Sequence, residues 1–271
     1  MTDSLDCALP DFDNPPVVET VLSVQFERLP AMRSVHFGLF WQRVRDQFPN
    51  TEERPTLASI VEQATPLPVE LRFEVQETLL LPRLWLLNSA GTEMMQIQND
   101  RFIKNWRKCD ENEEYPRYAK TVKPAFERDF REFLAFLADE NLGAVKVNQC
   151  EVMYVNHIVA GEGWSNWDEI DKIFTFRMLP PAVPYPGQAE DISFRARFPI
   201  LGPAKEWIGR LHVDVQPAIR RSDNKRMYAM NLTARGIFGQ GYHFFDIGHR
   251  WVVKSFEHLT TERMHRIWRN K

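Results

Sequence analysis

Runs of alternating and helically spaced hydrophobic residues follow one another in a clear order along the first half of the chain. The β-branched run from Val17 to Phe26 predicts a strand. Segment 34–48 has apolar residues at helical spacing, with Ser34 as its N-cap. Further strands are predicted at 71–76, 84–88 and 93–108. A long helix follows, with an apolar stripe formed by Phe126, Phe130, Phe133, Leu134 and Leu137.

The second half repeats this order. A strand is predicted at 150–159, a helix at 165–176 and a proline-rich loop at 179–187. Three alternating strands and a helix follow, at 192–198, 210–216, 226–234 and 243–258. The final residues predict a short helix capped by Thr260 or Thr261, with an apolar side that docks on the body through Met264, Ile267 and Trp268.

Both halves therefore have the order β-α-β-β-β-α, and Glu19 and Glu151 occupy matching places in the two opening strands. This order predicts an α+β protein of two duplicated units with pseudo-two-fold symmetry, in which helices cover one face of a curved antiparallel sheet. The expected divisions are a flexible acidic lead at 1–16 and repeats at 17–146 and 147–271 that share one body. The alternative is that the repeat is not a true duplication, because the element order of many α+β chains can be divided into two similar halves.

Composition places the chain among folded globular proteins. Its 271 residues are 44% hydrophobic and 26% charged, which excludes the disordered and low-complexity classes. Thirty-four basic and 37 acidic residues give a net charge of −3, so bulk charge does not favour a nucleic-acid partner. We expect a cytoplasmic protein that does not enter the membrane, because the sequence has no run of about 20 apolar residues and the first residues lack the pattern of a secretory signal.

Four motifs, in this order along the chain, resemble those of a sporadically distributed family of prokaryotic proteins. They are NPPVVE near the start, NDRFIKNWRK in the middle, YPRY before the long helix and LTTERMHRIW at the end. The resemblance spans nearly the whole chain, but it carries over neither an activity nor catalytic residues. A patchy distribution is typical of defence and toxin–antitoxin modules, which is an analogy only. The duplicated order also looks like the TATA-binding-protein saddle and like helix-on-sheet ligand folds.

Common enzyme signatures are missing from the sequence. Glycine-rich phosphate loops, GxSxG and HExxH are all absent, so we expect no cofactor and assign no catalytic residue. Four histidines near the end raise the question of a metal site that would include Asp246, His249 and His265. Because the HxxxH spacing of a helical metal site is absent, we favour a packed or hydrogen-bonded His249 and expect no metal.

The exposed face of the second half offers the first group of candidate binding residues. Alternation along the three strands puts cations, one imidazole and one carboxylate opposite the apolar positions: Arg195, Arg197, Arg210, His212, Asp214 and Asn231, together with Thr233. If the strands are neighbours, this patch is suited to an anionic group. The alternative is a solvated sheet face with cross-strand ion pairs.

The first half supplies a second group of candidates. If 93–108 is one continuous strand, its exposed face carries Gln96, Gln98, Lys104 and Trp106. Two motifs here mix aromatic residues with arginine, a composition common at protein interfaces and on single-strand nucleic-acid platforms; they contain Asn105, Trp106, Arg107, Tyr115, Arg117 and Tyr118. The acidic run 110–114 lies between the motifs and would repel phosphate, so a protein partner is favoured.

These observations favour a non-enzymatic interaction protein, either antitoxin-like or a defence-associated partner of a neighbouring gene product. The alternative is a small-molecule binder or enzyme for an anionic ligand. Its pocket would lie between the sheet and a helix and use Arg195, Arg197, His212 and Asp214, with His212 exchanging the proton. Duplex binding on a saddle would need a strongly basic concave face, which the charge balance disfavours. A homo-oligomer is left open.

Overall fold

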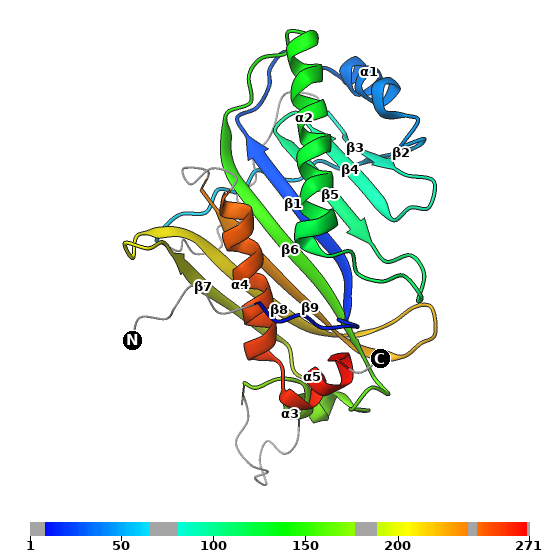
Figure 1. The fold of residues 1–271 in the computed structure, drawn as a ribbon, viewed down its shortest axis with the longest axis vertical. Helices are drawn as coiled ribbons and strands as arrows, with labels where there is room; N and C mark the ends of the chain where they lie inside the picture. Colours follow the sequence, from blue (N-terminus) through cyan, green and yellow to red (C-terminus); the bar gives the residue numbers. More distant parts are fainter. Residues whose placement is uncertain (1–8, 66–80, 177–188, 238–242, 270–271) are drawn as a thin grey trace.

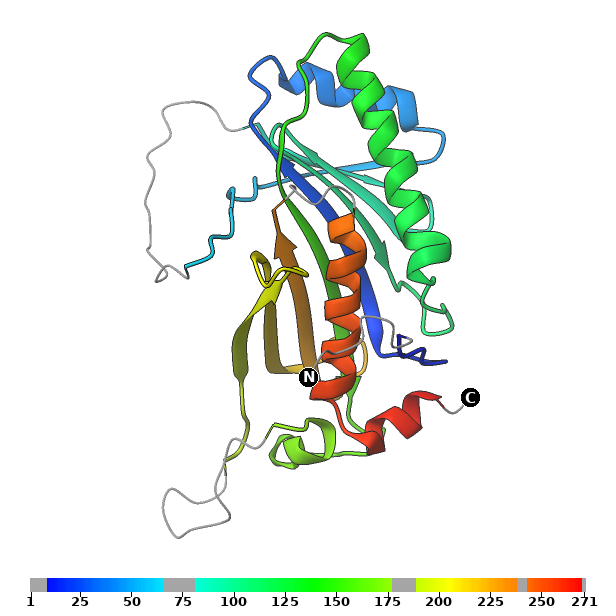
Figure 2. The ribbon, with the colours of Figure 1, turned by 60° about the vertical axis from the view of Figure 1, so that its left-hand side comes forward.

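In the computed structural model, the protein is described over residues 9–65, 81–176, 189–237 and 243–269. This part of the chain contains a nine-stranded antiparallel sheet, with helices on one of its faces (Figures 1 and 2). The strands are β1 Val17–Phe26, β2 Asn50–Arg54, β3 Arg83–Leu87, β4 Glu93–Gln98, β5 Arg101–Arg107, β6 Val147–Val159, β7 Phe194–Leu201, β8 Trp207–Ile219 and β9 Arg226–Gly236. The helices are α1 Ser34–Val44, α2 Lys123–Asp139, α3 Ile170–Ile173, α4 His243–Leu259 and α5 Glu262–Arg269, with single turns at Tyr118–Val122 and Trp167–Glu169.

Strands β1 and β6 pair with each other at the centre of the sheet, whose order is β2-β3-β4-β5-β1-β6-β9-β8-β7. Moving outward from β1, the order is β5, β4 and β3, and moving outward from β6 it is β9, β8 and β7. In each half, these three strands run outward in the reverse of their order along the chain. In the first half, β2 adds one more strand at the outer edge. The predicted α+β class with a large antiparallel sheet is confirmed.

The pattern in the sequence located several elements well and misread two. The strand at 17–26 and the helix beginning at His243 lie where they were predicted, whereas the helix at 165–176 is reduced to one turn and α3. The predicted strand 93–108 is wrong: it is a hairpin of β4 and β5, because Asn99 and Asp100 form a tight turn. The predicted strand 71–76 lies outside the described residues.

A core rich in phenylalanine lies between the sheet and its helices. In the first half, the ring of Phe102 on β5 lies 5.3–5.8 Å from those of Phe126, Phe130 and Phe133 on α2. In the second half, α4 packs closely on β6 and β9 at Gly248, where a Cβ would lie 2.9 Å from Val152. These contacts fix the face that the helices cover and leave the opposite face to polar side chains.

The two ends of the described chain pack against each other. Phe12 is only 5% exposed and contacts Phe256 and Trp268, and the Asn14 amide donates to the Trp268 carbonyl at 2.9 Å. Phe12 thus anchors residues 9–16, the described part of the predicted acidic lead, on the body of the protein. The docking predicted for Met264 and Trp268 in α5 is confirmed, since both are buried.

Candidate functional site

The face of the sheet opposite the helices, here called the polar face, is crossed by an extended segment of the same chain. This segment, residues 55–65, follows the edge strand β2 and is here called the strap. Figure 2 shows it on the side of the sheet away from α2 and α4. Its Ile60 and Val61 are 44% and 48% exposed, so the strap turns apolar side chains toward solvent and its backbone toward the sheet.

Glutamine side chains of the sheet bind the strap backbone in the way that a neighbouring strand would. The Leu57 amide donates to Gln98 Oε1, and Gln98 Nε2 donates to the Leu57 carbonyl, both at 2.9 Å. Gln149 spans two residues: its Oε1 accepts from the Glu62 amide and its Nε2 donates to the Ile60 carbonyl, both at 2.7 Å. Each glutamine thus supplies one acceptor and one donor, which satisfies backbone groups irrespective of side-chain identity.

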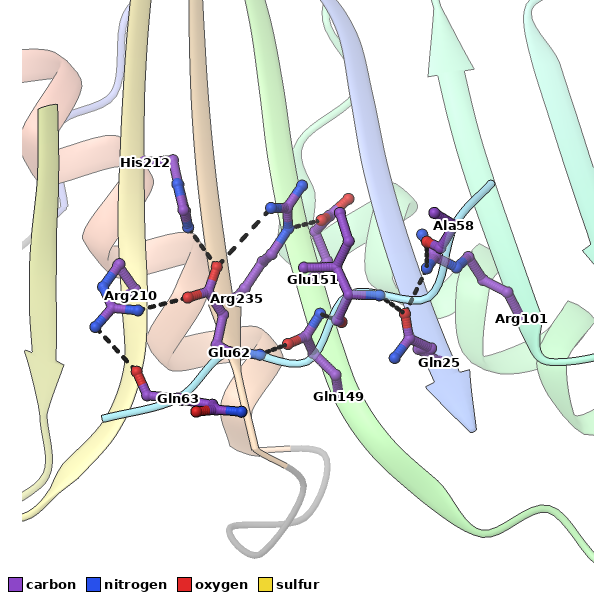
Figure 3. A network of polar contacts seen from close by, with 11 residues as sticks. Gln25, Ala58, Glu62, Gln63, Arg101, Gln149, Glu151, Arg210, His212 and Arg235 are labelled. Carbon is purple, nitrogen blue, oxygen red and sulfur yellow. Dashed lines mark hydrogen bonds and ion pairs between the residues drawn. The ribbon is translucent and has the colours of Figure 1, made fainter. Parts of the chain in front are cut away.

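Two further side chains complete this backbone recognition. Gln25 Oε1 accepts from the Ile60 amide at 3.0 Å, and Arg101 Nη2 donates to the Ala58 carbonyl at 3.0 Å and also to Gln25 Oε1 (Figure 3). Gln25 is 2% exposed, Gln149 4% and Arg101 9%. The strap both covers these polar groups and supplies hydrogen-bond partners for them, so water would have to take its place if it left the sheet.

The strap has one side-chain anchor, Glu62. Its carboxylate lies 2.6 Å from Arg210 Nη1, 2.5 Å from His212 Nε2 and 3.9 Å from Arg235 Nη1. Arg235 is also paired with Glu151 on β6 (Figure 3). Burial raises the pKa of Glu62, but hydrogen bonds and charge from His212 and Arg210 outweigh it, so the net pKa lies below its usual value.

The strand register brings the second-half candidates into three rows on the polar face, one of which holds Arg210 opposite Arg235. Arg195, Asp214 and Asn231 occupy one row of cross-strand neighbours, and Arg197 and His212 lie in the next. Arg195 Nη2 lies 2.7 Å from Asp214 Oδ2, with the arginine 75% exposed, so this pair is a surface ion pair. Arg195, Arg197, His212 and Asp214 face away from the helices and so do not line a pocket between sheet and helix.

The first-half motifs are divided between the two faces. Asn105 and Arg107 lie on the polar face, where Asn105 Nδ2 donates to Glu19 Oε1 at 2.6 Å. Lys104 and Trp106 lie on the helix side, contrary to the prediction, because the two-residue turn between β4 and β5 pairs Gln98 with Arg101 and so reverses the parity. Gln96 and Gln98 are on the polar face, as predicted.

A second part of the polar face forms an open cavity of about 790 Å³ around Glu19, Arg107 and His157. Burial raises the pKa of Glu19, an effect that the Asn105 hydrogen bond and the Arg107 charge oppose. Burial, aided by the Arg220 charge, lowers the pKa of His157. Acidic and basic side chains alternate around this cavity, so it has no single preferred ligand charge.

The remaining candidates lie on the helix side. Tyr115 and Tyr118 gather with Tyr154 and His249 next to a cavity of about 350 Å³, and Arg117 donates to the Phe12 carbonyl at 3.0 Å. His249 is stacked on Tyr118 with ring centroids 3.8 Å apart, in agreement with the expected packed, hydrogen-bonded histidine.

Several site residues were not singled out by the sequence, namely Gln25, Glu62, Arg101, Gln149, Arg235 and Tyr154. Three of them carried a usable signal. Gln25, Gln149 and Arg101 are polar residues at the ends of strongly apolar strands, where a buried polar residue requires a partner. The strap itself has no periodic pattern, so its contact with the sheet was not visible.

Comparisons with protein-family models, with curated proteins and with solved structures give no match. Within the described residues, no group of three or more His, Cys, Asp or Glu side chains is placed to hold a metal ion. No helix in the same part of the chain is long and apolar enough to cross a membrane.

Proposed function

We propose that this protein is a non-enzymatic interaction protein whose polar face binds an extended acidic segment of a partner protein. The observation that carries the proposal is the strap, an extended peptide that the sheet holds by its backbone and by one carboxylate. Recognition of this kind combines main-chain hydrogen bonds with one side-chain pocket, as strand-binding domains do. In the free protein, the strap occupies the face that the partner would use.

The chemistry of the face defines the partner segment. Gln98 and Gln149 contact only backbone atoms of the strap, so they tolerate many side chains. Arg210 and His212 require an acidic residue at the position of Glu62. The exposed Ile60 and Val61 do not contribute to this selection. A partner segment therefore needs an extended conformation and a glutamate or aspartate at one position.

A labelled peptide with the sequence of residues 55–65 tests the proposal in solution. Tethering gives the strap a high effective concentration, so the peptide should bind the Glu62→Gln protein about tenfold or more tightly than the wild type. A peptide with glutamine at the position of Glu62 is the matched control and should lose this advantage. Absence of peptide binding to the Glu62→Gln protein would contradict the proposal, and so would equal binding of the two peptides.

The partner itself is sought among products of neighbouring genes. A co-expressed neighbouring protein with an acidic extended segment is expected to co-purify with this chain, and Arg210→Met should weaken its retention. If the neighbour is toxic, this chain is expected to restrain it. Retention that is unchanged by Arg210→Met would place the interface elsewhere, and growth inhibition unchanged by this chain would exclude the antitoxin form.

A small anionic ligand is the second candidate, favoured by the carboxylate that already lies between Arg210 and His212. The shared chemistry is a single anionic group, so the peptide experiment also separates the two functions. Displacement of the labelled peptide by millimolar acetate or inorganic phosphate would favour the small ligand. Resistance of the peptide to both anions would favour the extended protein segment, whose backbone bonds the anions cannot replace.

We also infer that the two halves are a duplicated unit with the strand order of a TATA-binding-protein-like saddle. The strand order outward from the centre is the same in both halves. Glu19 pairs with Arg107, and Glu151 pairs with Arg235. Val21 pairs with Met153 across the centre, at the same sequence offset that separates Glu19 from Glu151. Superposition of β1–α2 on β6–α4 in an experimental structure tests this, and a mismatch in register would contradict it.

A further inference from the structure

The cavity of about 350 Å³ on the helix side is separate from the polar face. It lies between α4, the loop before α2 and residues 9–17. Apolar side chains form most of its walls: Phe12, Val17, Leu232, Val252 and Phe256. Each of these five is at most 7% exposed, so the walls are held by packing. The volume is within the range of small-molecule sites, and Phe12 closes one side of it.

One edge of the cavity carries a chain of hydrogen-bonding groups. The Tyr115 and Tyr154 hydroxyls are 2.7 Å apart, and the Tyr154 hydroxyl is 2.9 Å from His249 Nδ1. Tyr118 stacks on His249 with an interplanar angle of 9° and donates to Asp246 at 3.2 Å. The cavity therefore has aromatic faces and a few polar atoms gathered at one edge, the usual arrangement of a specific small-molecule pocket.

The lining of the cavity is nearly neutral. Burial raises the pKa of Tyr115 to about 12 and lowers that of His249 to about 4, so both side chains are uncharged near pH 7. Arg117 Nη1 lies 2.5 Å from Asp11 Oδ1, which balances its charge. Lys120 also borders the cavity and is exposed to solvent. A charged ligand would lose its hydration in this cavity, and these groups would not supply an unpaired buried charge to compensate for that loss.

We propose that this cavity binds an uncharged, flat aromatic molecule that carries a hydroxyl group. Its ring would lie between the aromatic and aliphatic walls, and its hydroxyl would join the hydrogen-bonded edge formed by Tyr115, Tyr154 and His249. The proposal does not depend on the polar face, because the strap and the cavity are on opposite sides of the sheet.

Two naphthalene derivatives with the same ring system test the ligand chemistry. 2-Naphthol is uncharged at pH 7, whereas 2-naphthoate is an anion. Saturation-transfer NMR and calorimetry with the full chain should show binding of 2-naphthol with an affinity about tenfold or more above that of 2-naphthoate. Absence of 2-naphthol binding would overturn the proposal, and so would an equal affinity for 2-naphthoate.

Variants of the protein test the location. Val253 borders the cavity on α4, and Val253→Trp should fill the space and abolish 2-naphthol binding. Val35→Trp is the matched control, because Val35 is 62% exposed on α1, and binding should be unchanged. Tyr154→Phe keeps the ring and removes one hydroxyl, so it should weaken 2-naphthol about tenfold. If Val253→Trp fails to fold, Tyr154→Phe decides: unchanged 2-naphthol affinity in that variant would overturn the proposal.

Discussion

Replacement of Glu62 by glutamine is the perturbation with the most direct consequence for the strap. Glutamine preserves the size of the side chain and the backbone amide that donates to Gln149, so the change is confined to the carboxylate, which loses its charge and exchanges one acceptor oxygen for an NH2 donor. Arg210 then lacks its carboxylate partner while it is still covered. The protein can relieve this by letting the strap leave the sheet, because Arg210 is then solvated. We therefore expect local opening of the strap rather than unfolding of the core.

The burial of the ion pair sets the size of the effect. The side chains of Glu62 and Arg210 are 8% and 6% exposed, so water screens their attraction little. Loss of one partner from a buried pair costs about 3–5 kcal/mol. His212 is 27% exposed, and its contribution is accordingly smaller. At about 1.4 kcal/mol per tenfold change, strap opening should increase by roughly two to three and a half orders of magnitude.

Amide hydrogen exchange measures this opening at three positions. The amides of Leu57, Ile60 and Glu62 each donate to a glutamine side chain, so their exchange requires the strap to open. Faster exchange is expected at these amides in Glu62→Gln, up to the rate of an unprotected peptide. Glu53→Gln, at an exposed position in β2, is the matched control and should leave the rates unchanged. An acceleration below about tenfold in Glu62→Gln would refute the reasoning.

Three further predictions concern the helix side. Burial lowers the pKa of His249 to about 4 in the folded protein, below its unfolded value near 6.5. The free energy of unfolding should therefore fall by about 3 kcal/mol as pH decreases between these two values. NMR titration of the imidazole and urea unfolding check this, and a pKa near 6.5 in the folded protein would contradict it. Lys104 and Asp129 form an ion pair of 2.7 Å with both side chains at most 5% exposed, and Arg128 contacts the other Asp129 oxygen at 2.7 Å. Because Arg128 still compensates Asp129, Lys104→Met should lower the free energy of unfolding by about 1–3 kcal/mol in urea titrations. A loss under about 0.5 kcal/mol would exclude a stabilising role. A Cβ on Gly236 would lie 1.8 Å from the Phe244 ring, so Gly236→Ala should destabilise the protein by about 1–3 kcal/mol. Gly38 in α1 has open space around it, so Gly38→Ala should stabilise the protein by about 0.5–1 kcal/mol. The midpoint of thermal unfolding should fall for the first variant and rise for the second, and a shift in the same direction for both would contradict this account of packing at the two glycines.

The fold was predictable where a hydrophobic pattern is local and strong. The strand at Val17–Phe26 and the stripe of α2 follow from side-chain spacing alone, because one face of each must be buried. The hairpin of β4 and β5 was missed because Asn99 and Asp100, which form the turn, were included in one continuous strand prediction. A turn of two residues shifts the parity of every later position, so Lys104 and Trp106 were assigned to the wrong face.

The candidate site was predictable only within single strands. Alternation placed Arg210 and His212 on the polar face, and the strand register agrees with that placement. Their partner Glu62 lies about 150 residues away in sequence, in a segment without periodicity. Contacts of this kind depend on how the chain returns across the sheet, which no short-range pattern encodes. The cavity beside His249 has the same origin, because its walls come from both ends of the chain.

The contacts of the strap show that the near-neutral net charge conceals a local concentration of positive charge on the polar face. A net charge of −3 argued against a polyanion partner, yet the polar face does contain buried cations at Arg101 and Arg210 and a partly buried one at Arg235. Arg210 and Arg235 are balanced locally, by Glu62 of the strap and by Glu151. Departure of the strap would remove one carboxylate and leave the Arg210 charge without its partner, beside His212 and polar amides that favour an extended backbone. The face would then attract a segment that supplies the same carboxylate, so competition with the strap sets the affinity that any partner must exceed.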